Sequence, residues 1–166
     1  MGEGKKDKVK REFSAGGVVF KKERNKILWL VAKSTPNKKY PGEFWRLPKG
    51  WLDDEDGRVY PGPLAKGERK ATEEEIRKSA LREVGEEGGV EAETVKKIET
   101  VKYFTKTIQG PVLKFVTFYL MRWLRDLPEG YDHETDKIAW LPLEEAEEKL
   151  SREREREILR KASSLL

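Results

Sequence analysis

The 166-residue sequence predicts a single domain of the mixed α+β class. Runs rich in β-branched and aromatic residues occur before residue 48 and again between residues 95 and 124. A helix with clear start and stop signals lies between these two groups, and two further helices close the chain. Because strands and helices follow one another without an internal repeat, a repeat architecture is not expected.

The N-terminal part is expected to form a tail followed by a hairpin. Residues 1–11 carry five basic and two acidic residues and are interpreted as a flexible basic tail, so that the folded domain spans residues 12–166. A solubilising terminus is the favoured role of this tail, and a basic arm for nucleic acid is the alternative. Runs around 16–20 and 27–32, separated by the charged segment 21–26, predict two paired strands. A loop over 35–43 and a short strand over 44–47 follow.

The central helix is expected to begin after a long inserted loop at residues 53–71. Thr72 and Glu75 have the spacing of a capping box, which predicts a helix that runs to about Glu87 and ends at Gly88-Gly89. The stretches 95–108 and 112–124 predict a long hairpin. A short strand at 138–140 and a helix opened by Pro142 come next.

The last helix is expected to start at a Ser151 cap and to reach about Leu165. Its first part alternates Arg and Glu, which predicts ion pairs such as Arg152–Glu155 and Glu153–Arg156 on a solvent-facing helix. No chemistry is expected from this segment.

The composition limits the chemistry that the chain can carry. It has no cysteine and one histidine, so disulfides, thiol nucleophiles and His- or Cys-rich metal sites are excluded. A metal site would need oxygen ligands, which favours hard ions such as Mg²⁺, Mn²⁺ or Ca²⁺. The net charge of +4 is too small to indicate nucleic-acid binding by itself. Without a membrane span or signal peptide, we expect a cytoplasmic protein with no membrane partner.

Three glutamates of the central helix form the first candidate site. Glu83, Glu86 and Glu87 stand at positions i, i+3 and i+4, so they project from one face and repel one another at neutral pH. A divalent cation would relieve this repulsion, and Arg82 could fix one carboxylate as a supporting partner. In a chain with 40% charged residues, a solvated helix face is the simpler interpretation of such a cluster. Two neighbouring features favour the metal site: the glycines that follow the helix, and the segment Leu47-Pro48-Lys49-Gly50.

These segments together resemble the Nudix hydrolase superfamily. Residues 82–90, REVGEEGGV, match the second half of the Nudix box, R-E-U-x-E-E-x-G-U, at every fixed position. Residues 47–50 resemble the opening of the box, and residues 14–20 resemble the first core strand. Residues 133–146 are similar to the closing segment of the diadenosine tetraphosphate hydrolase branch. One feature departs from the pattern, since Gly50 lies 24 residues before Glu74 where six are expected, which indicates an insertion of about 18 residues.

The resemblance implies an α/β/α sandwich with a mixed sheet and a set of site residues. Glu83, Glu86 and Glu87 would bind Mg²⁺, with Mn²⁺ as an alternative, and the Gly50 carbonyl would add a ligand. Arg82 would orient the carboxylates together with Glu74. The residues expected nearer the substrate are Glu134 as a further ligand or general base, His133 as a proton-transfer candidate, Lys49 for phosphate, and Tyr103, Trp45 and Tyr40 for a nucleobase. For Glu134 a plain surface role is an equal alternative, and for His133 it is the favoured one. For each of the three aromatic residues, a position in the core is the favoured alternative.

The implied activity is metal-dependent hydrolysis of a diphosphate linkage in a nucleoside diphosphate derivative, foremost a dinucleoside polyphosphate such as diadenosine tetraphosphate. The alternatives are a pyrophosphohydrolase for RNA 5′ ends, damaged nucleoside triphosphates or inositol pyrophosphates, and a catalytically silent nucleotide-binding module. A silent module normally loses box carboxylates, and this chain keeps all three. The expected partners are a nucleotide substrate or an RNA 5′ end, with the chain acting as a monomer or a homodimer.

Overall fold

The computed structural model describes residues 9–38, 41–53 and 62–166. Most of the predicted tail, Tyr40 and a large part of the predicted loop 53–71 therefore lie outside the described residues. The first strand begins at Lys10, so the last two residues assigned to the tail belong to the domain.

Seven strands form one mixed sheet whose central path runs β3-β2-β1-β6-β5. β4 and β7 pair with β1 and β2, outside this path. β1 pairs with β2 antiparallel and with β6 parallel, which makes the sheet mixed. The strands are β1 Lys10–Glu23, β2 Lys26–Ser34, β3 Trp45–Arg46, β4 Lys49–Trp51, β5 Val90–Thr107, β6 Gly110–Asp126 and β7 Thr135–Leu141.

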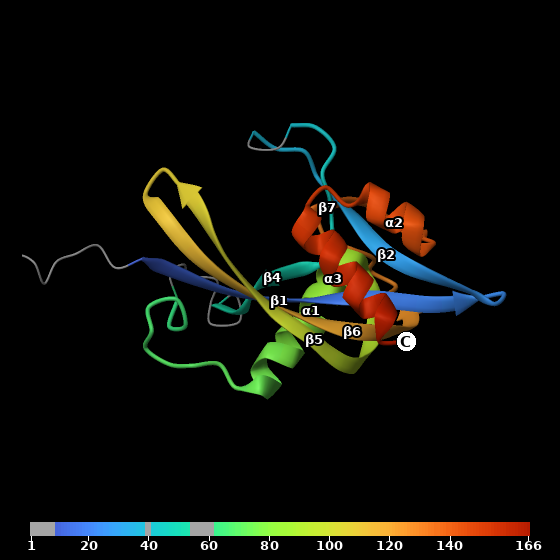
Figure 1. Cartoon of the computed structure of the whole chain (residues 1–166), viewed down its shortest axis with the longest axis horizontal. Coiled ribbons are helices and arrows are strands. Elements are labelled where there is room, and N and C mark those ends of the chain that lie inside the picture. Colours follow the sequence, from blue (N-terminus) through green and yellow to red (C-terminus); the bar gives the residue numbers. More distant parts are fainter. Residues whose placement is uncertain (1–8, 39–40, 54–61) are drawn as a thin grey trace, which may run out of the picture.

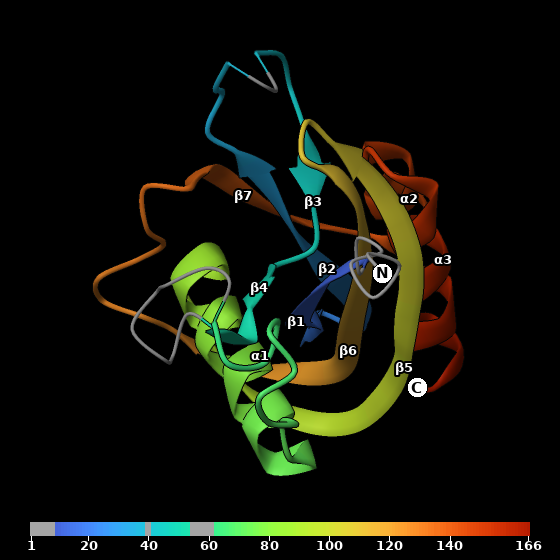
Figure 2. The same cartoon turned by 90° about the vertical axis from the view of Figure 1, so that its left-hand side faces the viewer.

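Helices cover both faces of the sheet. Figure 1 shows α2 (Leu143–Lys149) and α3 (Glu153–Ser164) in front of the sheet and α1 (Glu73–Gly88) behind it, and Figure 2 shows the same two layers side-on. Two apolar clusters correspond to these layers, because Leu150 and Leu159 pack in one and Ala80 and Val84 of α1 in the other. The predicted α+β fold and α/β/α sandwich are confirmed.

Both predicted hairpins are present, and the second is longer than expected. β5 and β6 pair from Val90↔Asp126 to Thr107↔Gly110, and the register shifts at three places along the ladder. Such bulges increase the local twist of a strand pair. The hairpin is therefore strongly curved, as Figure 2 shows, and it extends well beyond the central strands.

The last helix differs from its prediction at its start and along one face. α3 begins at Glu153 with Arg152 as N-cap residue, and the Ser151 hydroxyl accepts a hydrogen bond from the Trp45 amide at 2.9 Å instead of capping the helix. Four residues at helical spacing are buried: Glu155, Ile158, Leu159 and Ala162. The predicted solvent-facing helix is thus wrong for this face, because the apolar positions dock α3 on the sheet. In the described part of the chain, no helix is long and apolar enough to span a membrane.

Candidate active site

Helix α1 is fixed at both ends by local sequence signals. The Thr72 side chain accepts from the Glu75 amide at 3.1 Å, and the Glu75 carboxylate accepts from the Thr72 amide at 3.0 Å, which completes the predicted capping box. Gly89 adopts a left-handed conformation at φ 70° and closes the C-terminus. These caps set the length of the helix. Ala80 and Val84 pack its last turns, which carry the acidic residues, against the sheet.

The acidic residues of α1 do not form a solvated face. Glu83 and Glu87 have relative exposures of only 3% and 4%, whereas the Glu86 side chain is about one-third exposed. A buried carboxylate needs compensating partners, because transferring an unpaired charge from water costs several kcal/mol or more. The burial of two of the three glutamates therefore argues against the simple charged-surface interpretation.

The segment that opens the box lies directly against these carboxylates. Strand β4 pairs with β1, and the Pro48 carbonyl accepts a hydrogen bond from the Gly17 amide at 3.1 Å. The Lys49 amide donates to the Glu87 carboxylate at 2.9 Å. A Cβ atom added to Gly50 would overlap the Glu83 carboxylate, so only glycine permits this close approach. The insertion after Gly50 therefore leaves the opening glycine and the helix together in space.

The acidic side chains meet in a cavity of about 320 Å³. It brings together residues from β4, α1 and the loop before β7, as predicted, and it adds Trp51 and Asp132, which sequence reasoning missed. Its lining consists of Lys49, Gly50, Trp51, Glu83, Glu86, Glu87, Asp132, His133 and Glu134. The loop is pinned to α1, because the Asp132 amide donates to the Glu86 carbonyl at 2.7 Å and the Thr135 hydroxyl donates to the Glu87 carbonyl at 2.8 Å.

Two arginines neutralise the carboxylates in this structure. Arg82 contacts Glu83 at 2.9 Å and Glu86 at 3.2 Å, which confirms that it pairs with the acidic cluster. Arg46, which sequence reasoning missed, contacts Glu87 at 3.2 Å. Burial raises the pKa of Glu87 to about 7, and the Arg46 guanidinium opposes that shift. Additional positive charge near Glu87 would therefore favour the ionised form of this carboxylate.

The donor set of this cavity fits a hard divalent cation. Five carboxylate side chains line it, and the Gly50 backbone lies directly against Glu83. Among residues 9–38, 41–53 and 62–166, no three acidic or histidine side chains are close enough to hold an ion as they stand. The contacts of Arg82 with Glu83 and Glu86 account for this arrangement, since they direct carboxylate oxygens toward the guanidinium. Rotation of the carboxylates away from Arg82 would free those oxygens for metal binding.

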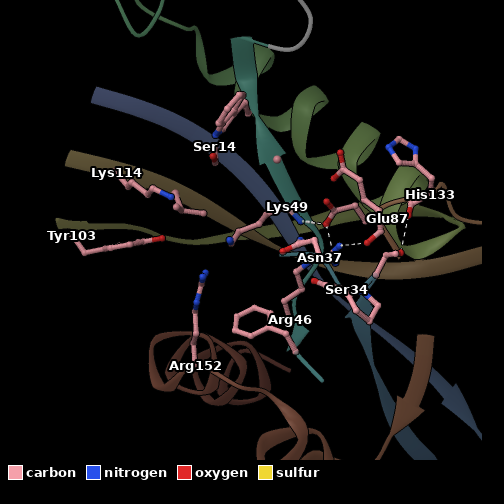
Figure 3. A pocket seen from close by; sticks show the side chains of 17 residues that line it. Ser14, Ser34, Asn37, Arg46, Lys49, Glu87, Tyr103, Lys114, His133 and Arg152 are labelled. Atoms are coloured by element: carbon pink, nitrogen blue, oxygen red, sulfur yellow. Dashed lines mark hydrogen bonds and ion pairs between the residues drawn. The ribbon is translucent and has the colours of Figure 1, made fainter. Parts of the chain in front are cut away.

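A larger cavity of about 550 Å³ joins the acidic one. The two share six residues: Lys49, Gly50, Trp51, Glu87, His133 and Glu134. Figure 3 shows Glu87 and His133 at one end and Tyr103, Lys114 and Arg152 at the other, with Lys49 between them. The larger cavity is therefore lined by several cations, whereas the smaller one is lined mainly by carboxylates.

In the described part of the chain, three predicted site residues line neither cavity: Arg82, Glu74 and Trp45. Glu74 pairs with Arg77 at 2.9 Å and with Lys78 at 3.8 Å, so the orienting role expected of it together with Arg82 is not seen in this structure. Trp45 is only 5% exposed and packs in the core cluster of α2 and α3, because β3 directs it to that face. Tyr40 lies outside the described residues. Tyr103 lines the larger cavity, as predicted.

Several cavity residues were not predicted from the sequence. The missed residues include Arg46, Phe44, Lys114, Asn37 and Arg152. For Arg46 the signal was its place in the strand just before the opening of the box, which points its side chain toward the same site as Lys49. For Arg152 the signal was the i, i+3, i+4, i+7 spacing of residues 155, 158, 159 and 162. This spacing marks the face of α3 that docks on the sheet, and the docked helix fixes the position of its N-cap residue, Arg152.

Comparison with known proteins identifies the class to which this fold and site belong. The model of the NUDIX domain family matches residues 10–162. The chain therefore belongs to the NUDIX domain family. Members of this family generally use divalent metal ions, in agreement with the carboxylate cavity.

The similar proteins support the family and the fold. A candidate mutator protein, MutT4, of Mycobacterium tuberculosis is 28% identical over 123 residues, which cover 74% of this chain and 42% of that protein. The chain thus matches less than half the length of that curated relative. The Ap4A hydrolase of C. elegans, solved as a binary complex, has a TM-score of 0.56 and 22% identity over 93% of this chain and 96% of that one. The NUDIX domain of Shewanella oneidensis NrtR, solved with ADP ribose, has a TM-score of 0.59 and 14% identity over 93% and 88% of the two chains.

Proposed function

We propose that this protein hydrolyses a diphosphate linkage in a nucleoside polyphosphate, with a dinucleoside polyphosphate such as diadenosine tetraphosphate as its substrate and Mg²⁺ as its metal ion. Mn²⁺ is a chemically similar alternative. The observation that carries the proposal is the junction of the two cavities at Glu87. A carboxylate cavity suited to cations opens there into a larger cavity lined by cationic side chains. A polyphosphate bound in the larger cavity would reach the acidic one with one of its phosphates.

The metal site of the proposal consists of Glu83, Glu86 and Glu87 with the Gly50 carbonyl. Bound divalent ions supply charge neutralisation on the phosphate oxygens and lower the pKa of a coordinated water. Arg82 compensates the charge of Glu83 and Glu86 in this structure, and the two carboxylates would turn from it toward a bound ion. The protein contributes mainly position and electrostatic stabilisation, as expected for phosphoryl chemistry.

Glu134 is the candidate base that accepts a proton from the attacking water. Its backbone is fixed, because its amide donates to the Asp132 carboxylate at 3.0 Å and its carbonyl accepts from the Arg46 guanidinium at 3.1 Å. Its carboxylate contributes to the raised pKa of Glu87, which places negative charge near that residue. A base must lie within hydrogen-bonding reach of the water it activates, and Glu134 lines both cavities at their junction.

The large cavity suits a polyphosphate with an attached nucleoside. Arg46, Lys49, Lys114 and Arg152 line it with positive charge, and planar guanidinium groups can bind phosphate oxygens through two hydrogen bonds. Tyr103 and Phe44 present rings on which a nucleobase could stack, a contact that contributes about 1–3 kcal/mol per base. The solved complex of the NrtR domain with ADP ribose shows that this fold can accommodate a nucleotide-type ligand.

A hydrolysis screen with Mg²⁺ tests the proposal. The panel contains diadenosine tetraphosphate, ADP-ribose, triphosphorylated RNA and oxidised dGTP, and products are separated by chromatography. We expect the highest kcat/KM for diadenosine tetraphosphate, with ATP and AMP as products. A higher kcat/KM for triphosphorylated RNA or oxidised dGTP would replace the proposed substrate with that compound. Binding without hydrolysis of any compound would contradict the proposed activity and favour a nucleotide-binding module.

A further inference from the structure

The start of helix α3 is joined to the segment that opens the metal site. The Trp45 amide donates to the Ser151 hydroxyl at 2.9 Å, and the Ser151 amide donates to the Trp45 carbonyl at 3.0 Å. Two residues later, the Leu47 amide donates to the Glu155 carboxylate at 2.6 Å. These bonds span more than 100 residues of sequence, so the position of Lys49 and Gly50 depends on the C-terminal helix.

Glu155 is a buried carboxylate between two cations of the large cavity. It is 4% exposed, and its second oxygen lies 3.9 Å from both the Lys49 ammonium group and the Arg152 guanidinium. A buried carboxylate with an amide donor and two cationic neighbours is well compensated. Because Lys49 begins β4 and Arg152 is the N-cap residue of α3, a single carboxylate couples two separate walls of the cavity.

Arg152 is directed into the cavity by its surroundings. It is the N-cap residue of α3, but its side chain makes no capping hydrogen bond, and its guanidinium lies 4.8 Å from the centre of the Phe44 ring. The neighbouring Arg154 guanidinium lies 3.7 Å from the centre of the Tyr103 ring, which also lines the cavity. A ring face restricts the guanidinium plane and leaves its edge available for hydrogen bonds. Arg152 is thus positioned between Glu155 and the Phe44 ring at the wall of the cavity.

We propose that Arg152 is a specificity-determining residue that binds a substrate phosphate at the end of the cavity remote from the carboxylates, and that Glu155 is the positioning residue that holds Arg152 and Lys49 for this contact. The inference rests on the proposed function, because it concerns the same cavity. Figure 3 shows Arg152 and Glu87 on opposite sides of Lys49, so a phosphate near Arg152 is not the one attacked at the metal site. The residue therefore favours substrates with a long phosphate chain over those with a single diphosphate.

The first test compares two substrates in two variants of α3. Arg152→Gln removes the cation, and Arg160→Gln removes a partly exposed cation of the same helix that pairs with Glu147 and Glu153. Losing one hydrogen bond to a charged group corresponds to about a tenfold effect. We expect the ratio of kcat/KM for diadenosine tetraphosphate to that for ADP-ribose to fall about tenfold in Arg152→Gln and to stay within about twofold in Arg160→Gln. An unchanged ratio in Arg152→Gln would overturn the role of Arg152.

The second test addresses Glu155 through a double-mutant cycle. Glu155→Gln keeps an oxygen that can accept from the Leu47 amide, so the fold is expected to survive the loss of charge. If Glu155 acts by holding Arg152, the effect of Arg152→Gln should shrink to less than about threefold in the Glu155→Gln background. Additive effects of the two substitutions would contradict the positioning role, whereas a purely structural role would leave the ratio of the two substrates unchanged.

A binding titration separates this inference from the proposed activity. Inorganic tripolyphosphate is titrated into the full chain and into Arg152→Gln by calorimetry, in the presence of a chelator. We expect the variant to have an approximately tenfold higher Kd. If the wild-type protein hydrolysed none of the screened compounds, the proposed function would fail, and this titration would still decide the inference. An equal Kd for both proteins would overturn it.

Discussion

Replacement of Gly50 by alanine tests whether this glycine, which precedes the insertion, is needed for the metal site on α1. A Cβ atom at this position would lie 2.0 Å from a Glu83 carboxylate oxygen, whereas ordinary contact begins at 3.4 Å. The carboxylate would have to retreat by about 1.4 Å, yet Glu83 is 3% exposed and held by Arg82 at 2.9 Å. Because metal–ligand distances deviate from their ideal values by only about 0.2 Å, a displaced Glu83 would no longer bind the ion.

We expect Gly50→Ala to lower kcat/KM by about 100-fold and to raise the Mg²⁺ concentration needed for half-maximal rate. Crowding of a packed site should also lower the free energy of unfolding by about 1–3 kcal/mol. The assay is hydrolysis of diadenosine tetraphosphate as a function of Mg²⁺, with urea unfolding measured in parallel. Gly42→Ala is the matched control, because a Cβ atom there meets nothing within 4 Å. A Gly50→Ala protein with wild-type rate and Mg²⁺ dependence would refute the assignment of Gly50.

Two further substitutions test residues that were predicted for the site but that line neither cavity in the structure. Glu74→Ala should leave kcat/KM within about twofold and change the free energy of unfolding by less than about 1 kcal/mol, because its partners Arg77 and Lys78 are exposed. A large loss of activity, measured in the same assay, would support the prediction that Glu74 and Arg82 together orient the carboxylates. Trp45→Phe should lower the free energy of unfolding by about 1–3 kcal/mol in urea titrations without changing KM, because Trp45 packs in the core. A raised KM with unchanged stability would return Trp45 to the substrate site.

The local parts of this fold could be predicted from sequence because their signals are local. The capping box at Thr72 and the glycine at 89 fixed the bounds of α1 to within a residue or two. The spacing of Glu83, Glu86 and Glu87 placed three carboxylates on one face, and the structure confirms that they line one cavity. The resemblance of residues 82–90 to the Nudix box then identified the family.

The contacts that the sequence did not reveal join residues far apart in the chain. Arg46 meets Glu87 across 41 positions, and Glu155 reaches the Leu47 amide across 108. In a segment where Arg and Glu alternate, a buried glutamate resembles its exposed neighbours in residue type. Only the apolar spacing further along the helix distinguishes them, because it shows which face docks on the sheet. The packing of α3 on the sheet therefore determines which charged residues at its start lie at the cavity.

The carboxylates of α1 allow the most direct test of the account, which is the Mg²⁺ dependence of diadenosine tetraphosphate hydrolysis by Glu86→Gln and Glu87→Gln. Each substitution preserves shape and removes one charge, and Glu73→Gln on the same helix is the control, since its side chain is 75% exposed. We predict a loss of about 100-fold or more in kcat for both variants, with circular dichroism spectra like those of the wild-type protein and a control of normal activity. Wild-type Mg²⁺-dependent turnover in both variants would contradict the metal site.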